Sequence, residues 1–141
     1  MKRAANHSPN QFLEAARHLV SHSDTGSQGI WPRAAAHLCR QALEIGLQNF
    51  WKKYLPGLEN MPLRVQLICL PTYMKDKKLA RAIAYTWAAL SNACHHHVYE
   101  LASTASELQM WIETAEAMLT AASNPEKSPG IDSGRVVEPF V

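Results

Sequence analysis

The sequence predicts an all-α protein, an up-and-down bundle of four long helices and one short helix. Apolar residues recur at i, i+3, i+4 and i+7 in four long segments, whereas the alternation typical of strands is nearly absent. Short linkers rich in turn-forming residues separate these segments, and short linkers join antiparallel neighbours in a bundle. We expect one domain over 1–123, followed by a tail over 124–141 that lacks periodicity and is expected to be disordered.

The first two helices have clear start and stop signals. Ser8 can cap and Pro9 can open a helix over 9–21. After a polar stretch, a second helix is predicted over 32–54, with a broad apolar stripe along one side. A Pro-Gly pair at 56–57 ends it, because neither residue continues a helix well.

The remaining helices follow in the same way. Pro62 can open a short helix, which we expect Pro71 to stop. The segment 76–94 is apolar on most sides, as a central bundle helix should be, and Trp87 lies on its apolar stripe. A Thr-x-x-Glu capping box at 104–107 starts the last helix.

Composition excludes several classes of function. The net charge of +2 falls short of the footprint of an obligate nucleic-acid binder but leaves small RNA substrates open. No window approaches the roughly 18 apolar residues of a membrane span, and the N-terminus lacks the apolar segment of a secretory signal, so we expect a cytoplasmic protein with no membrane contact. Three widely spaced cysteines suggest reduced core thiols. Neither a phosphate-binding glycine loop nor an HExxH motif is present.

The densest group of candidate functional side chains ends the 76–94 segment. His95, His96 and His97 are consecutive, with Cys94 before them and Tyr99 shortly after. Imidazole exchanges a proton near neutral pH and binds metals or phosphates, so any chemistry is expected here. Successive helical residues point about 100° apart, so the three rings cannot all face one point. A structural role, such as capping the helix C-terminus, is the alternative.

The second predicted helix carries another polar stripe at helical spacing. Its members are Arg33, His37, Arg40 or Gln41, Glu44 and Gln48. Such stripes are usually solvated faces. The functional alternative places Arg33 and Arg40 over the histidines as phosphate contacts, with Glu44 orienting an imidazole.

A metal site is a weaker alternative. Cys94 and His97 share a helical face, and Cys39, Cys69 or His37 could add a third ligand. Zinc sites usually show two close ligand pairs, and no second pair is present. We therefore expect neither a metal nor a cofactor.

The window Ser91-Asn92-Ala93-Cys94-His95-His96 resembles the R-N/D-x-x-x-H motif of the HEPN superfamily of small helical domains. Asn92 and His96 fall on the polar and histidine positions, and Ser91 stands at the arginine position. The arginine-bearing segment 33–44 is similar to the first core helix of HEPN-like domains, and the resemblance spans roughly residues 10–120. Catalytic members of the family are metal-independent ribonucleases that form their site across a dimer, in toxin–antitoxin, phage-defence and RNA-processing systems.

The resemblance implies two functions. In the first, the chain is a catalytically degenerate, dimeric HEPN-like module that binds a protein or RNA partner, because serine at position 91 cannot act as a phosphate counter-charge. The groove for that partner would be formed by Ser91, His95, His97, Tyr99, His37 and Glu44. In the alternative, it is an endoribonuclease with His96 as general acid or base, Asn92 orienting it, and Arg33 or Arg40 supplying positive charge.

Overall fold

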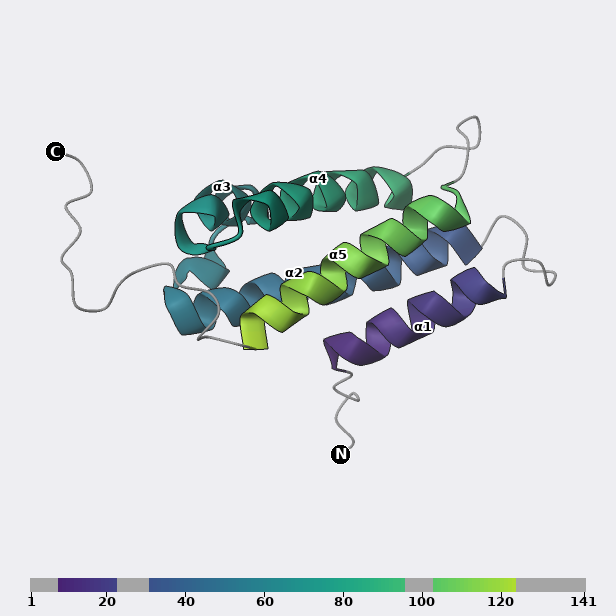
Figure 1. Cartoon of the computed structure of the whole chain (residues 1–141), viewed down its shortest axis with the longest axis horizontal. Helices are drawn as coiled ribbons and strands as arrows, with labels where there is room; N and C mark the ends of the chain where they lie inside the picture. The colour runs from purple at the N-terminus through teal and green to yellow at the C-terminus, as the bar shows by residue number, and fades with distance from the viewer. Residues whose placement is uncertain (1–7, 23–30, 96–102, 124–141) are drawn as a thin grey trace, which may run out of the picture.

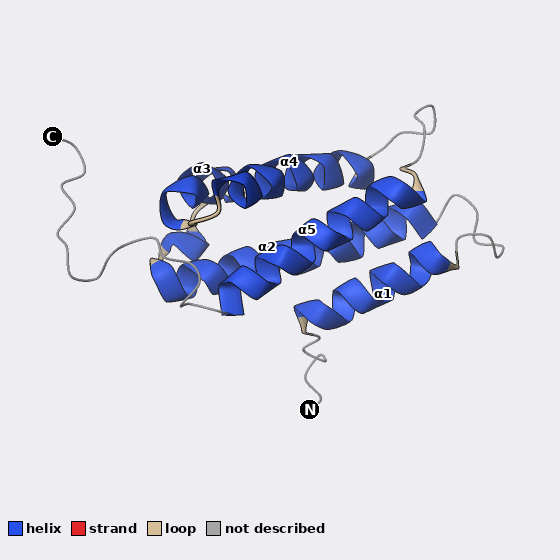
Figure 2. Ribbon diagram, in the orientation of Figure 1, coloured by secondary structure: helices blue, strands red, loops and turns tan. Residues whose placement is uncertain are grey.

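The computed structural model describes residues 8–22, 31–95 and 103–123, and these ranges are almost entirely helical (Figures 1 and 2). The elements are α1 (Pro9–Ser21), α2 (Trp31–Tyr54), the 3₁₀ turn η1 (Leu58–Asn60), α3 (Leu63–Tyr73), α4 (Lys77–Cys94) and α5 (Ala105–Ser123). No strand occurs within the described ranges. The predicted fold class, a bundle of four long helices and one short helix, is confirmed.

The four long helices alternate in direction, and α2 lies at the centre of the bundle (Figure 1). Helix α2 contacts α1, α4 and α5, whereas the short helix α3 packs mainly on α4. The expectation that the 76–94 segment is the central helix is wrong. Its apolar character comes largely from alanines, and α4 leaves Ala88 and most of its polar residues exposed.

Side-chain caps start the helices where the sequence places them. Ser8 and Gln11 form a reciprocal capping box at α1, with bonds of 2.8 and 3.3 Å. Asp76 accepts the N–H of Leu79 at α4. Thr104 and Glu107 form the predicted capping box at α5. Because each cap satisfies N–H groups that a first turn cannot pair internally, these boundaries are local properties of the sequence.

The prediction that Pro71 stops the third helix is wrong. Helix α3 continues through Pro71 to Tyr73 and ends where the Met74 N–H bonds to the Leu70 carbonyl at 2.9 Å. A proline lacks an N–H donor and crowds the carbonyl four positions earlier, but the residues after it keep their own N–H groups, and here the Met74 N–H still bonds to a carbonyl before Pro71. The tail at 124–141 lies outside the described residues.

The core lies where α2 packs against α1, α4 and α5. Its largest fully buried side chains are Trp51, Phe50, Leu13, Leu43, Leu47, Leu70, Ile83, Leu90, Leu108, Ile112 and Met118. Gly46 permits the close approach of α2 to α5, since a Cβ there would lie 2.9 Å from Leu119 Cδ2. Cys39 and Cys94 are buried and free, as expected of core thiols, while Cys69 is half-buried and also free.

Candidate functional site

The described structure places part of the predicted histidine cluster at the C-terminal end of α4. Helix α4 ends at Cys94, and His95 occupies the C-cap, where its N–H bonds to the Asn92 carbonyl at 3.1 Å. The side chains of Asn92 and His95 are exposed. His96, His97 and Tyr99 lie outside the described residues.

A broad, shallow hollow of about 680 Å³ lies along this part of α4. Its described lining comprises Tyr85, Trp87, Ala88, Ala89, Ser91, Asn92 and His95. Ser91 and Asn92 differ in environment because neighbouring helical positions point about 100° apart. Asn92 is exposed, whereas the Ser91 Oγ is buried and has no hydrogen-bond partner within the described part of the chain.

Arg33 joins the start of α2 to the end of α4. Its Nε donates a 3.0 Å hydrogen bond to the Cys94 carbonyl, 61 positions away in sequence. The last carbonyls of a helix lack internal partners and carry partial negative charge, so a guanidinium stabilises them. Arg33 is exposed, which leaves its other N–H groups accessible to a ligand. The structure therefore brings Arg33 of α2 to the C-terminal end of α4, where Cys94 directly precedes His95 in sequence.

Arg40 and Glu44, one turn apart on α2, form a second contact with α4. Arg40 Nε lies 2.9 Å from Glu44 Oε2, and the Trp87 indole N–H donates to the same oxygen over 3.0 Å. The Arg40 guanidinium also lies over the Trp87 ring, with Cζ 5.8 Å from the ring centroid. The hydrogen bond to Glu44 is the main cause that raises the pKa of Arg40. Its charge is therefore already compensated inside the protein.

The polar stripe of α2 is consequently not one uniform solvated face. Arg40 and Glu44 are half-buried between α2 and α4, while Arg33, His37 and Gln48 are exposed. Glu44 does not orient an imidazole in the described structure, since its hydrogen-bond partners are Trp87 and Arg40. Sequence reasoning missed this use of Trp87, although an indole N–H on a buried stripe signals that an acceptor must lie nearby.

The two buried thiols near this site are poor nucleophiles. Burial raises the pKa of Cys39 to about 12, with the neighbouring Cys94 adding to the effect and Arg17 opposing it. Burial also raises the pKa of Cys94, against the opposing hydrogen bond from Arg40. Because the thiolate is the reactive form, burial lowers the nucleophilicity of both thiols.

The described ranges contain no group of three histidine, cysteine or acidic side chains close enough to hold a metal ion. None of the helices in the same ranges has the length and apolar character required to cross a bilayer. Comparisons of the chain with family models, curated proteins and solved structures found no match. The resemblance to the HEPN superfamily therefore stays a prediction made from the residues.

Proposed function

We propose that this chain is a HEPN-like, catalytically degenerate and dimeric module that binds an RNA partner at the C-terminal end of α4. We call this surface the histidine end and define it by Arg33, Ser91, Asn92 and His95. The observation that carries the proposal is the position of Arg33, whose guanidinium sits on the Cys94 carbonyl beside these residues. The resemblance also implies a defence or toxin–antitoxin setting.

The chemistry of the histidine end favours RNA over a protein partner. Arg33 offers a cationic donor for phosphate oxygens, and exposed Asn92 and His95 offer further hydrogen bonds. Helix α4 contributes no acidic side chain between its two ends. Glu44, the carboxylate that reaches α4 from α2, is already bonded to Arg40 and Trp87. A phosphate backbone therefore meets no acidic side chain on α4 itself.

The same geometry argues against the family's catalytic arrangement. Position 91 holds a serine whose Oγ is buried, so the motif supplies no guanidinium there. Arg40 is held by Glu44 and is not free to neutralise a reacting phosphate. A transition state with growing phosphate charge requires such a preorganised cation.

One observation keeps the endoribonuclease as a second candidate. Arg33 is anchored on the carbonyl of Cys94, two positions before His96. In that alternative, Arg33 takes the electrostatic role, while His96 acts as the general acid or base with Asn92 orienting it. No metal is needed for either function.

A single assay separates the two. A labelled single-stranded RNA is mixed with the full chain in EDTA, fluorescence anisotropy reports binding, and a denaturing gel reports cleavage. We expect binding without cleavage, weakened about tenfold by Arg33→Ala with a salt slope smaller by about one. The matched control is Arg64→Ala, which removes an exposed arginine from α3.

The outcomes are distinct. Cleavage that persists in EDTA and disappears in His96→Ala selects the endoribonuclease. An RNA affinity that is absent, or equal in Arg33→Ala and Arg64→Ala, contradicts RNA binding at the histidine end.

A further inference from the structure

Helices α4 and α5, which contact each other, expose opposite charges. Helix α4 contains three lysine or arginine residues and no acidic one, whereas α5 contains three glutamates and no basic residue. These side chains are all exposed: Lys77, Lys78, Arg81, Glu107, Glu113 and Glu116. Two helices that contact each other therefore expose side chains of opposite charge.

The exposed residues of α4 form a continuous stripe. Its members are Lys78, Arg81, Tyr85, Ala88, Asn92 and His95. Their spacing alternates between three and four, so they share one side of the helix. Tyr85 is 70% exposed, and with Ala88 and Ala89 it contributes to the lining of the hollow on α4. The α4 stripe thus combines positive charge with an open apolar recess.

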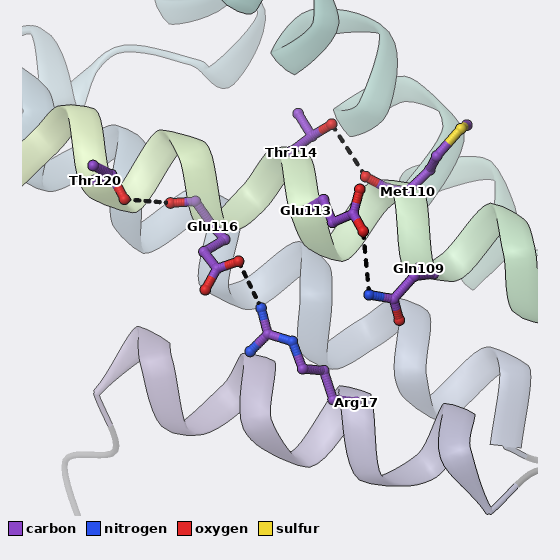
Figure 3. Close-up of polar contacts among 7 residues, drawn as sticks. All are labelled: Arg17, Gln109, Met110, Glu113, Thr114, Glu116 and Thr120. Atoms are coloured by element: carbon purple, nitrogen blue, oxygen red, sulfur yellow. Dashed lines mark hydrogen bonds and ion pairs between the residues drawn. The ribbon is translucent and has the colours of Figure 1, made fainter.

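Helix α5 offers a side chain that matches this recess. Met110 is 57% exposed, and Glu113 lies less than one turn further along. Figure 3 shows Met110 and Glu116 on opposite edges of α5, with Glu116 directed to Arg17 of α1. Methionine is flexible and makes favourable contacts with aromatic rings.

The charges on the two helices are not matched within one molecule. In the described ranges, the ion pairs are Arg17–Glu116 and Arg40–Glu44. Lys78 and Arg81 take part in neither. Glu113 accepts only a long 3.4 Å bond from Gln109 on its own helix. Lys78, Arg81 and the Glu113 carboxylate remain available to another molecule.

We propose that a second copy of this chain covers the part of the α4 stripe from Lys78 to Ala88 with its α5, seating Met110 beside Tyr85 and leaving Asn92 and His95 open. This inference rests on the dimeric state in the proposed function and specifies the interface. A twofold axis makes the contact twice, since each copy supplies one α4 and one α5. The apolar contact forms the centre, and Lys78, Arg81 and Glu113 form a charged rim that selects the orientation.

Charge reversal tests the pairing. Dissociation constants are measured by sedimentation for wild type, for Lys78→Glu/Arg81→Glu, and for Glu113→Lys. We expect a wild-type dimer that weakens with added salt. Each variant alone should dimerise at least about tenfold more weakly, because like charges then face each other twice.

Mixing the two variants provides the decisive measurement. In a mixed dimer the reversed α4 meets the reversed α5, and the two native faces meet each other, so both contacts are attractive. We expect the mixture to regain dimerisation near the wild-type level. This restoration also rules out misfolding as the cause of the single-variant defects.

Two controls separate this inference from the proposed function. The first is Arg64→Glu on α3, which should leave the dissociation constant of the dimer unchanged. The second is RNA binding, measured by fluorescence anisotropy on the same samples, all of which keep Arg33. A monomeric wild type, or a mixture that fails to recover, overturns the interface. RNA binding that persists in that case leaves RNA recognition at the histidine end standing, whereas intact dimerisation without RNA binding contradicts that recognition alone.

Discussion

The indole N–H of Trp87 on α4 donates a 3.0 Å hydrogen bond to the carboxylate of Glu44 on α2. The two residues are 43 positions apart, and both are half-buried. The bond, together with the Arg40–Glu44 pair, fixes α4 against the central helix just before the histidine end.

Replacing Glu44 tests the contribution of this bond. Glu44→Ala should lower the free energy of unfolding by about 1–3 kcal/mol, because it leaves the Trp87 donor without an acceptor in a half-buried position. Glu44→Gln keeps a carbonyl acceptor and should lose less. Urea denaturation measures both, with Glu14→Ala on the exposed face of α1 as the control. Equal losses in the Ala and Gln variants would show that the Trp87 bond adds nothing.

Arg33→Ala should loosen the end of α4. The variant loses the bond to the Cys94 carbonyl, and we expect a cost of about 0.5–1.5 kcal/mol. Amide hydrogen exchange should accelerate over 91–95 more than elsewhere, because the last helical turn loses its anchor. His37→Ala, one turn further along α2 and exposed, is the control. Unchanged exchange in Arg33→Ala would mean that the helix end holds without the guanidinium.

Thr104→Ala should destabilise the start of α5. Its hydroxyl accepts the Glu107 N–H at 3.1 Å, and loss of such a cap costs about 1 kcal/mol. Thr104→Ser retains the hydroxyl and should stay near wild type. Thermal unfolding followed by circular dichroism compares them. If the serine variant unfolds at the same temperature as the alanine variant, the hydroxyl is not the stabilising group.

The buried Cys39 thiol predicts a loss of stability at high pH. Burial raises its pKa from 9.0 to about 12, so the folded state holds this proton more tightly than the unfolded chain does. The stabilisation is therefore fully present below pH 9.0 and is lost as the pH rises toward 12. The free energy of unfolding then falls by at most about 1.4 kcal/mol per pH unit through this one group.

Cys39→Ala removes the titrating group and serves as the reference for this prediction. Denaturation at a series of pH values should show a steeper decline for wild type than for Cys39→Ala above pH 9.0. Parallel curves would contradict a titrating Cys39.

Local signals predicted most of the helices well. Ser8, Asp76 and the Thr104–Glu107 box satisfy N–H groups within three residues of themselves, so they act without help from the rest of the chain. Pro71 misled because its effect depends on how many turns follow it, and only the packed end of α3 shows that the helix finishes at Tyr73. The central position of α2 likewise depends on which helices surround it.

For the candidate site too, the sequence alone indicates some features and only the packed structure shows the others. The order of residues alone marks Asn92, His95 and Arg33 as candidates, and helical spacing places Lys78, Arg81 and Tyr85 on one side of α4. Spacing along one helix says nothing about contacts with another helix. Only the packed bundle brings Arg33 to the Cys94 carbonyl and the Trp87 indole N–H to the Glu44 carboxylate. It also leaves Met110 of α5 exposed.

The sequence by itself determined an all-helical chain and the starts of its helices, because periodicity and caps act over a few residues. The tertiary structure decided which polar groups form hydrogen bonds or ion pairs within the protein and which stay exposed to a partner. Burial and hydrogen-bond partners depend on neighbours brought together from distant positions. Arg33 and Cys94 are 61 positions apart, and neither residue carries a local sign of their contact.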